Sequence, residues 1–99
     1  MKARRDDLLG GDGPRAAIRR FPGHLQLIRE LLADDENFRG ICDDLAAAEQ
    51  ALAAVDQLPK AVQAERRSEY EELIEDLAKE IRTSFRLARI IPIKRPPKR

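Results

Sequence analysis

The sequence predicts an all-α protein organised as an antiparallel helical hairpin, in the manner of a short coiled coil. Two observations carry this prediction. Apolar residues between positions 38 and 55 recur at alternating steps of three and four, which places them on one helix face: Phe38, Ile41, Leu45, Ala48, Leu52 and Val55. A second pattern of this kind runs from Tyr70 to Ala88. The composition agrees, because charged residues make up 37% of the 99-residue chain and aromatic residues only 4%.

The chain divides into three parts. Residues 1–20 are predicted to be a flexible arm, because glycines and a proline interrupt any helix there: Gly10, Gly11, Gly13 and Pro14. Residues 21–88 form the helical hairpin domain. Residues 89–99 form a basic, proline-rich tail, because the last three prolines end helical structure: Pro92, Pro96 and Pro97.

A short helix is expected to open the domain. Pro22 suits the first turn of a helix, where its missing N–H is not needed. Five apolar residues follow within eight positions: Leu25, Leu27, Ile28, Leu31 and Leu32. A helix this short is marginal alone in water, so we expect it to lie over the open end of the hairpin, near Phe38 and Phe85.

The second helix is expected to begin after Asp35, whose carboxylate can accept a hydrogen bond from a first-turn N–H. Glu36 then places a negative charge at the positive end of the helix dipole. Gly40 lies inside this helix, and its small size either lets the first helix cross close to the backbone or is incidental. The pattern continues without a breaker until Asp56.

Pro59 separates the second helix from the third, which is expected to run from about Lys60 to Ala88. Residues 63–69 are mostly polar, so the hairpin should be least well packed beside the turn. The facing apolar residues would then be free for a partner: Ala51, Leu52, Val55 and Leu58. Because small domains often gain stability by associating, we expect a homodimer or an unidentified protein partner at this surface.

The net charge of +1 conceals a strong asymmetry. Residues 1–20 carry a net +3, residues 21–83 a net −8, and residues 84–99 a net +6. The ends are either solubilising or able to touch an anionic partner. The residues that would contact such an anion are Arg86, Arg89, Lys94, Arg95, Lys98 and Arg99. No aromatic residues are interleaved with them to stack on bases, so a nucleic-acid role has weak support.

The sequence shows no catalytic pattern. His24 is the only histidine and is interpreted as a partly exposed ring near a helix start. Cys42 is followed by Asp43 and Asp44, which disfavour a thiolate, so it is interpreted as a small flanking apolar residue or the edge of a dimer contact. There is no serine–histidine–acid set, phosphate loop or metal-ligand spacing, which predicts no enzyme activity, no cofactor and no metal.

One acidic row follows the third helix at steps of four, three and four: Glu65, Glu69, Glu72 and Asp76. It is either a solvated face or a docking strip for a basic partner. No run approaches the roughly 20 apolar residues that a membrane span needs. We also find no secretory signal, and a cytoplasmic location is therefore expected.

The sequence also resembles a family. Phe21, Pro22 and His24 open a helix, and Asp35 and Phe38 follow; this pattern is similar to small bacterial proteins of the YdcH-like type. The likeness covers roughly residues 21–85. It implies an antiparallel helical hairpin with no assigned activity and supplies no catalytic residues.

These observations predict a small non-catalytic protein that works by association. The first hypothesis is a protein–protein interaction or adaptor module that associates with itself. The second is an accessory nucleic-acid-binding protein that acts through its basic tails.

Overall fold

The computed structural model describes residues 11–90, and this part of the chain is entirely helical apart from short connections. The predicted all-α class is confirmed. Four α-helices and two 3-10 turns follow one another, with no strand among the described residues: α2 (Asp12–Arg20), η1 (Pro22–His24), α3 (Leu25–Asp34), α4 (Glu36–Ala53), η2 (Val55–Gln57) and α5 (Lys60–Ile90).

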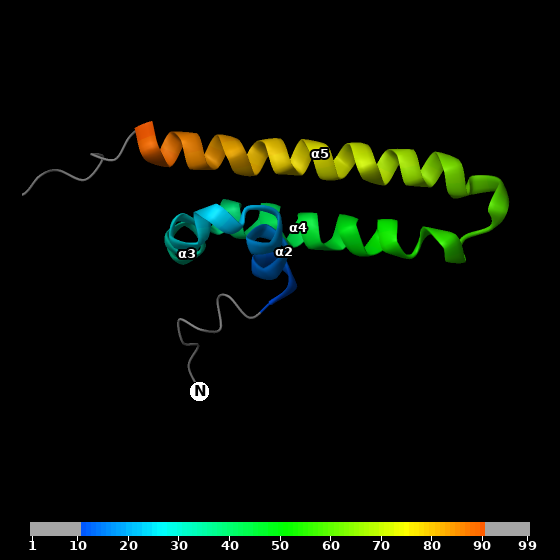
Figure 1. Cartoon of the computed structure of the whole chain (residues 1–99), viewed down its shortest axis with the longest axis horizontal. Helices are drawn as coiled ribbons and strands as arrows, with labels where there is room; N and C mark the ends of the chain where they lie inside the picture. Colours follow the sequence, from blue (N-terminus) through cyan, green and yellow to red (C-terminus); the bar gives the residue numbers. More distant parts are fainter. Residues whose placement is uncertain (1–10, 91–99) are drawn as a thin grey trace, which may run out of the picture.

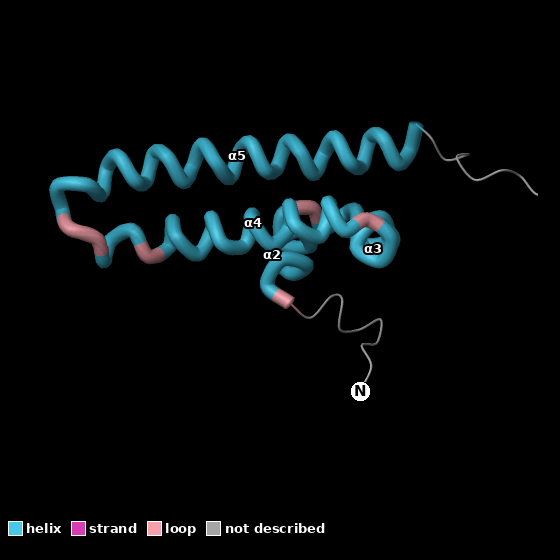
Figure 2. Tube along the Cα trace, turned by 180° about the vertical axis from the view of Figure 1, so that it is seen from behind, coloured by secondary structure: helices cyan, strands magenta, loops and turns pink. Residues whose placement is uncertain are grey.

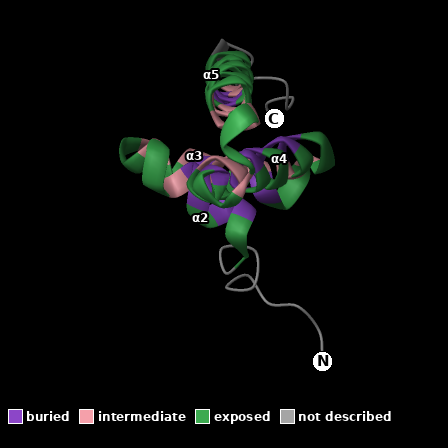
Figure 3. Ribbon diagram, turned by 90° about the vertical axis from the view of Figure 1, so that its right-hand side faces the viewer, coloured by how far each residue is buried: buried purple, intermediate pink, exposed green. Residues whose placement is uncertain are grey.

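The long helices α4 and α5 lie side by side and run in opposite directions, joined by the turn that contains η2 (Figures 1 and 2). Helix α2 crosses α4, and α3 lies at the end of the molecule that holds the last turns of α5 (Figure 1). Seen along the molecule, α5 forms one layer above α2, α3 and α4, and only its underside is buried (Figure 3). Helix α5 therefore presents most of its circumference to solvent.

One hydrophobic cluster lies between these layers. Phe38 is its largest fully buried side chain, and the ring of Phe38 lies 6.3 Å from the ring of Phe85 between centroids. Residues from all four α-helices contribute, including Ala16, Ile28, Leu32, Ile41, Leu45, Ile74, Leu77 and Ile81. The predicted faces of residues 38–48 and 74–85 thus meet in the core.

The predicted flexible arm over residues 1–20 is wrong for residues 12–20, which form α2. Pro14 falls in the first turn of this helix, where a missing N–H breaks no intrahelical hydrogen bond. Ala16 and Ala17 are 0% exposed, so the inner face of α2 is made of small residues that allow a close crossing. Residues 1–10 lie outside the described part of the chain.

The close approach between helices occurs at Gly13 and not at Gly40. A β-carbon added to Gly13 would lie 2.9 Å from the backbone nitrogen of Asp43 and 3.0 Å from its α-carbon. A β-carbon added to Gly40 would meet nothing within 4 Å. The helix expected to cross close to Gly40 is α3, and no atom of α3 approaches that position, so the small size of Gly40 is incidental to packing. The helix that passes close to the backbone of α4 is α2, beside Asp43.

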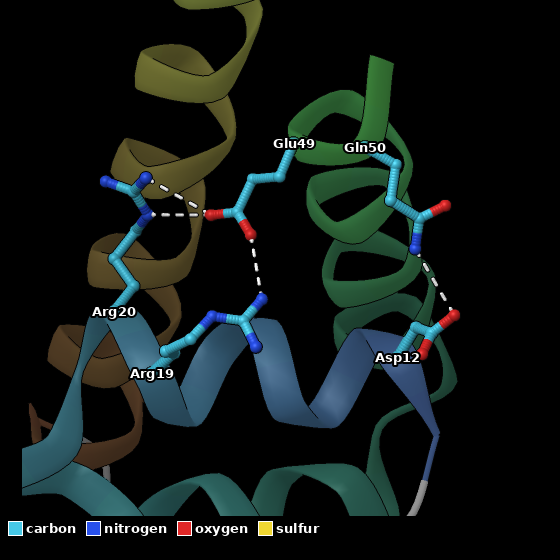
Figure 4. A network of polar contacts seen from close by, with 5 residues as sticks. All are labelled: Asp12, Arg19, Arg20, Glu49 and Gln50. Atoms are coloured by element: carbon cyan, nitrogen blue, oxygen red, sulfur yellow. Dashed lines mark hydrogen bonds and ion pairs between the residues drawn. The ribbon is translucent and has the colours of Figure 1, made fainter. Parts of the chain in front are cut away.

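Polar contacts fix the outer edge of the same crossing (Figure 4). Arg19 Nη2 donates to Glu49 Oε1 at 3.1 Å, and Arg20 Nη2 donates to Glu49 Oε2 at 3.2 Å. Gln50 Nε2 donates to Asp12 Oδ2 at 3.3 Å. These bonds are solvent-exposed, so they orient α2 more than they stabilise it.

The start of α4 follows the prediction. The backbone N–H of Phe38 donates to Asp35 Oδ1 at 3.1 Å, and Glu36 lies in the first turn. Asp35 thus caps the helix and simultaneously fixes the residue whose ring fills the core.

The turn beside η2 is better ordered than the polar sequence suggests. Gln63 Nε2 donates to the carbonyl oxygens of Asp56 at 3.2 Å and Leu58 at 2.9 Å. Arg67 Nη2 donates to Asp56 Oδ1 at 3.3 Å. The polar residues at the start of α5 therefore hold the turn, where we expected a poorly packed end.

Crossing a bilayer requires a long and strongly apolar helix, and none of the helices between residues 11 and 90 has that combination.

Candidate binding groove

A groove with aromatic and basic walls lies where the last turns of α5 meet the connection between α2 and α3. Its volume is about 430 Å³, and six residues line it: Phe21, His24, Arg82, Phe85, Arg86 and Arg89. We call this feature the arginine groove. Its two walls come from segments about sixty positions apart in the sequence.

The floor of the arginine groove is a packed set of rings. The imidazole of His24 stacks on Phe85, with centroids 4.5 Å apart and planes at 5°. Phe21 meets Phe85 edge to face at 5.3 Å. Phe85 itself is only 5% exposed, whereas Phe21 and His24 are half-buried. The floor therefore offers apolar ring edges more than open ring faces.

Arginines form the wall on α5. Arg82, Arg86 and Arg89 follow one another at steps of four and three, are exposed, and lie in the last turns of the helix. The Arg82 guanidinium carbon lies 5.8 Å from the centre of the Phe21 ring, which places this cation over an aromatic face. A cation also suits the negative end of the helix dipole, so Arg89, in the last turn, stabilises α5 as well as lining the groove.

Such a wall has defined chemistry. A guanidinium offers several N–H donors in a planar fork that matches a carboxylate or phosphate. Beside it, the rims of Phe21 and His24 can contact an apolar group. The arrangement therefore suits an anion that has an apolar group close to its charge.

Of the predicted anion-contacting residues, Arg86 and Arg89 line the groove as helical residues, so the predicted tail does not begin at residue 89. The other four lie outside the described residues: Lys94, Arg95, Lys98 and Arg99. Sequence reasoning missed Arg82 and the three rings. No aromatic residues are interleaved with the basic tail in sequence, but the fold brings Phe21 and His24, from a distant segment, beside Arg86 and Arg89.

The predicted partner surface is altered by the fold. Val55 is 1% exposed and is covered within its own hairpin, so it is not free to contact a partner. Ala51, Leu52 and Leu58 are half-buried, and Leu52 packs against the core. The polar contacts of Gln63 and Arg67 around η2 explain this closure, because they hold the first turns of α5 over the turn.

His24 and Cys42 are both placed by packing. His24 has the predicted half-buried position near a helix start, with the added stack on Phe85. Cys42 is 0% exposed within the core, so it is not the edge of a dimer contact. Burial, with a smaller contribution from Asp43, raises the pKa of the Cys42 thiol from 9.0 to about 12.

This shift predicts a pH-dependent loss of stability. In the unfolded chain Cys42 loses its proton near pH 9, whereas in the folded chain it keeps the proton up to about pH 12. Above pH 9.0 the unfolded state therefore binds fewer protons, and the stability that this thiol confers falls by about 1.4 kcal/mol per pH unit until about pH 12.

Urea unfolding across this range measures the effect. Cys42→Ala should lose the part of the slope that belongs to the thiol, and the rest of the slope should be the same in both proteins. Parallel curves for the two proteins would contradict the burial of Cys42.

A second groove, of about 330 Å³, lies between α2 and α4. Four of its five polar side chains pair with one another, Arg19 with Glu49 and Gln50 with Asp12 (Figure 4). These groups serve the helix crossing. Among residues 11–90, no group of three or more His, Cys, Asp and Glu side chains is placed to hold a metal ion.

Comparison with known proteins gives no relative: no protein-family model, curated protein or solved structure matches this chain. The resemblance to YdcH-like proteins stays a prediction.

Proposed function

We propose that this protein is a non-catalytic helical interaction module that recognises an acidic protein segment through the arginine groove. The observation that supports it is the gathering of Arg82, Arg86 and Arg89 beside the half-exposed rings of Phe21 and His24. Electrostatic complementarity of this kind selects partners and speeds their encounter. The expected setting is the cytoplasm.

The segment that fits is acidic, and an apolar side chain among its carboxylates would add a further contact. The carboxylates would pair with the guanidinium groups, and the apolar side chain would cover the edges of Phe21 and His24. Self-association is one form of this recognition, because α5 contains an acidic segment of its own.

Nucleic acid is the second candidate, and the placement of arginines beside aromatic rings favours it. Binding of single strands depends on stacking bases on open ring faces. Here Phe85 is 5% exposed and His24 covers one of its faces, while Arg82 lies over Phe21. Few ring faces are left on which bases could stack, so an acidic protein segment is favoured over a nucleic acid as the ligand of the arginine groove.

Fluorescence anisotropy with the full chain tests the proposal. The probes are a labelled synthetic peptide of alternating glutamate and leucine and a labelled single-stranded oligonucleotide, each at low and high salt. We expect the peptide to bind, and Arg86→Ala to weaken it about tenfold, which is the usual loss for one charge-assisted hydrogen bond.

Arg29→Ala is the matched control, since Arg29 is an exposed arginine on α3 that does not line the groove. It should leave peptide binding unchanged. Equal weakening by both variants, or no peptide binding at low salt, would contradict the proposal. Binding of the oligonucleotide alone would support the second candidate, and its loss on replacing Lys94 and Arg95 by alanine would assign it to the basic tail.

A further inference from the structure

We infer that the acidic segment taken by the arginine groove is α5 of a second copy of this chain, paired antiparallel across a two-fold axis. This inference rests on the proposed function and names the partner of the same site. Two observations support it. One exposed stripe of α5 is negative in its first half and positive in its second half, and α2 and α3 lie near only one half of that helix.

The stripe consists of residues at steps of three and four, which keeps them on one side of the helix. All of its members are exposed: Ser68, Glu71, Glu75, Lys79, Arg82, Arg86 and Arg89. We call it the α5 stripe. Its first half carries only negative charge and its second half only positive charge, so the stripe is complementary to itself when reversed.

Reversal also gives matching spacings. When Glu75 of one copy faces Arg82 of the other, Glu71 faces Arg86 in the same register, and Ser68 faces Arg89. The distance along the helix from Glu71 to Glu75 equals that from Arg82 to Arg86, because both pairs are four residues apart. Lys79 lies beside the two-fold axis, within reach of Glu75 of the second copy.

Each of these contacts occurs twice across a two-fold axis, because both copies use the same surface patch. Each acidic half would enter the arginine groove of its neighbour at Arg82 and Arg86. The acidic row of Glu65, Glu69, Glu72 and Asp76 lies about a quarter turn further around α5 than the α5 stripe. It is outside the predicted contact and stays exposed.

The shape of the molecule leaves room for this arrangement. Helices α2 and α3 lie at the level of the C-terminal half of α5, whereas α4 alone accompanies the N-terminal half (Figure 1). In an antiparallel pair, α2 and α3 of one copy come beside the unoccupied N-terminal half of the other. The end of each molecule that contains α2 and α3 thus lies beside the end of its neighbour that contains only α4 and α5.

Charge reversal in the full chain tests the inference. Glu71→Arg and Arg86→Glu each create two like-charge contacts in a homodimer, so each variant should dimerise at least tenfold more weakly than the native chain. An equimolar mixture of the two restores both opposite-charge contacts and should recover dimers. Sedimentation velocity over a range of concentrations measures all three samples, and circular dichroism checks that each variant keeps its helix content.

Glu80→Arg is the matched control. Glu80 is exposed and lies nine residues from Glu71, which is half a turn around the helix and outside the α5 stripe. It should leave dimerisation unchanged, and raised salt should dissociate the native dimer by screening the exposed pairs.

The inference is overturned if the native chain stays monomeric at low salt, or if the mixture fails to recover dimers. Peptide binding separates this result from failure of the proposed function. Glu71→Arg keeps every residue of the arginine groove, so a monomeric chain that still binds the acidic peptide leaves the proposed function standing and removes only the second copy as its partner.

Discussion

Replacing Phe38 by alanine is expected to lower the free energy of unfolding by about 3–5 kcal/mol, which is the usual cost of emptying a buried phenylalanine site. Phe38 is 0% exposed and is the largest fully buried side chain among the described residues. It lies next to Phe85, so its loss also loosens the floor of the arginine groove. Small domains have a total stability of about 5–15 kcal/mol, so this variant should be near unfolding.

Urea unfolding followed by circular dichroism measures this loss. Leu87→Ala is the control, because Leu87 is a large apolar residue of α5 that is 52% exposed. It should change stability by about 0.5 kcal/mol or less. Similar losses for Phe38→Ala and Leu87→Ala would contradict the placement of the core between α5 and the lower layer.

Gly13→Ala is expected to destabilise the protein by about 1–3 kcal/mol, the usual cost of overpacking. The added methyl group would lie 2.9 Å from the backbone nitrogen of Asp43 and 3.0 Å from its α-carbon. Backbone atoms of a helix cannot rotate away as a side chain can, so α2 must move off α4. The contacts of Arg19 and Arg20 with Glu49 would be stretched as a result.

Gly40→Ala is expected to raise the free energy of unfolding, the opposite of Gly13→Ala, and therefore serves as the control. Gly40 is exposed within α4, and an added methyl group would meet nothing within 4 Å. Alanine is favoured over glycine inside a helix by about 1 kcal/mol, so this variant should gain stability. Urea midpoints that move in the same direction for both variants would contradict the close crossing of α2 over α4 at Gly13.

The long helices could be predicted because their signals are local. Asp35 caps α4 as its position before a helical pattern indicates, and Pro59 stands immediately before the start of α5. Helix α2 could not be predicted in the same way. Gly13 and Pro14 oppose a helix by their intrinsic preferences, but both fall in its first turn, and Gly13 is needed there only because α4 passes close by.

The candidate site was predictable only in part, for a related reason. The basic character of Arg86 and Arg89 is visible in the sequence, and both line the groove. The rings of Phe21 and His24 belong to the connection between α2 and α3. The sequence placed the following helix near Phe85, but it did not indicate that these two rings would pack on Phe85 beside the arginines. The predicted exposure of Val55 failed because Gln63, a polar residue, holds the turn closed through two carbonyl groups.

Nuclear magnetic resonance of the isotope-labelled full chain tests whether the arginine groove binds an acidic protein segment. The acidic glutamate–leucine peptide is titrated into the protein at low salt, and backbone and imidazole shifts are followed. We expect the largest changes at Phe21, His24, Arg82 and Arg86. Changes centred on Ala51, Leu52 and Leu58, or none at any residue of the monomeric Glu71→Arg chain, would contradict binding at this groove.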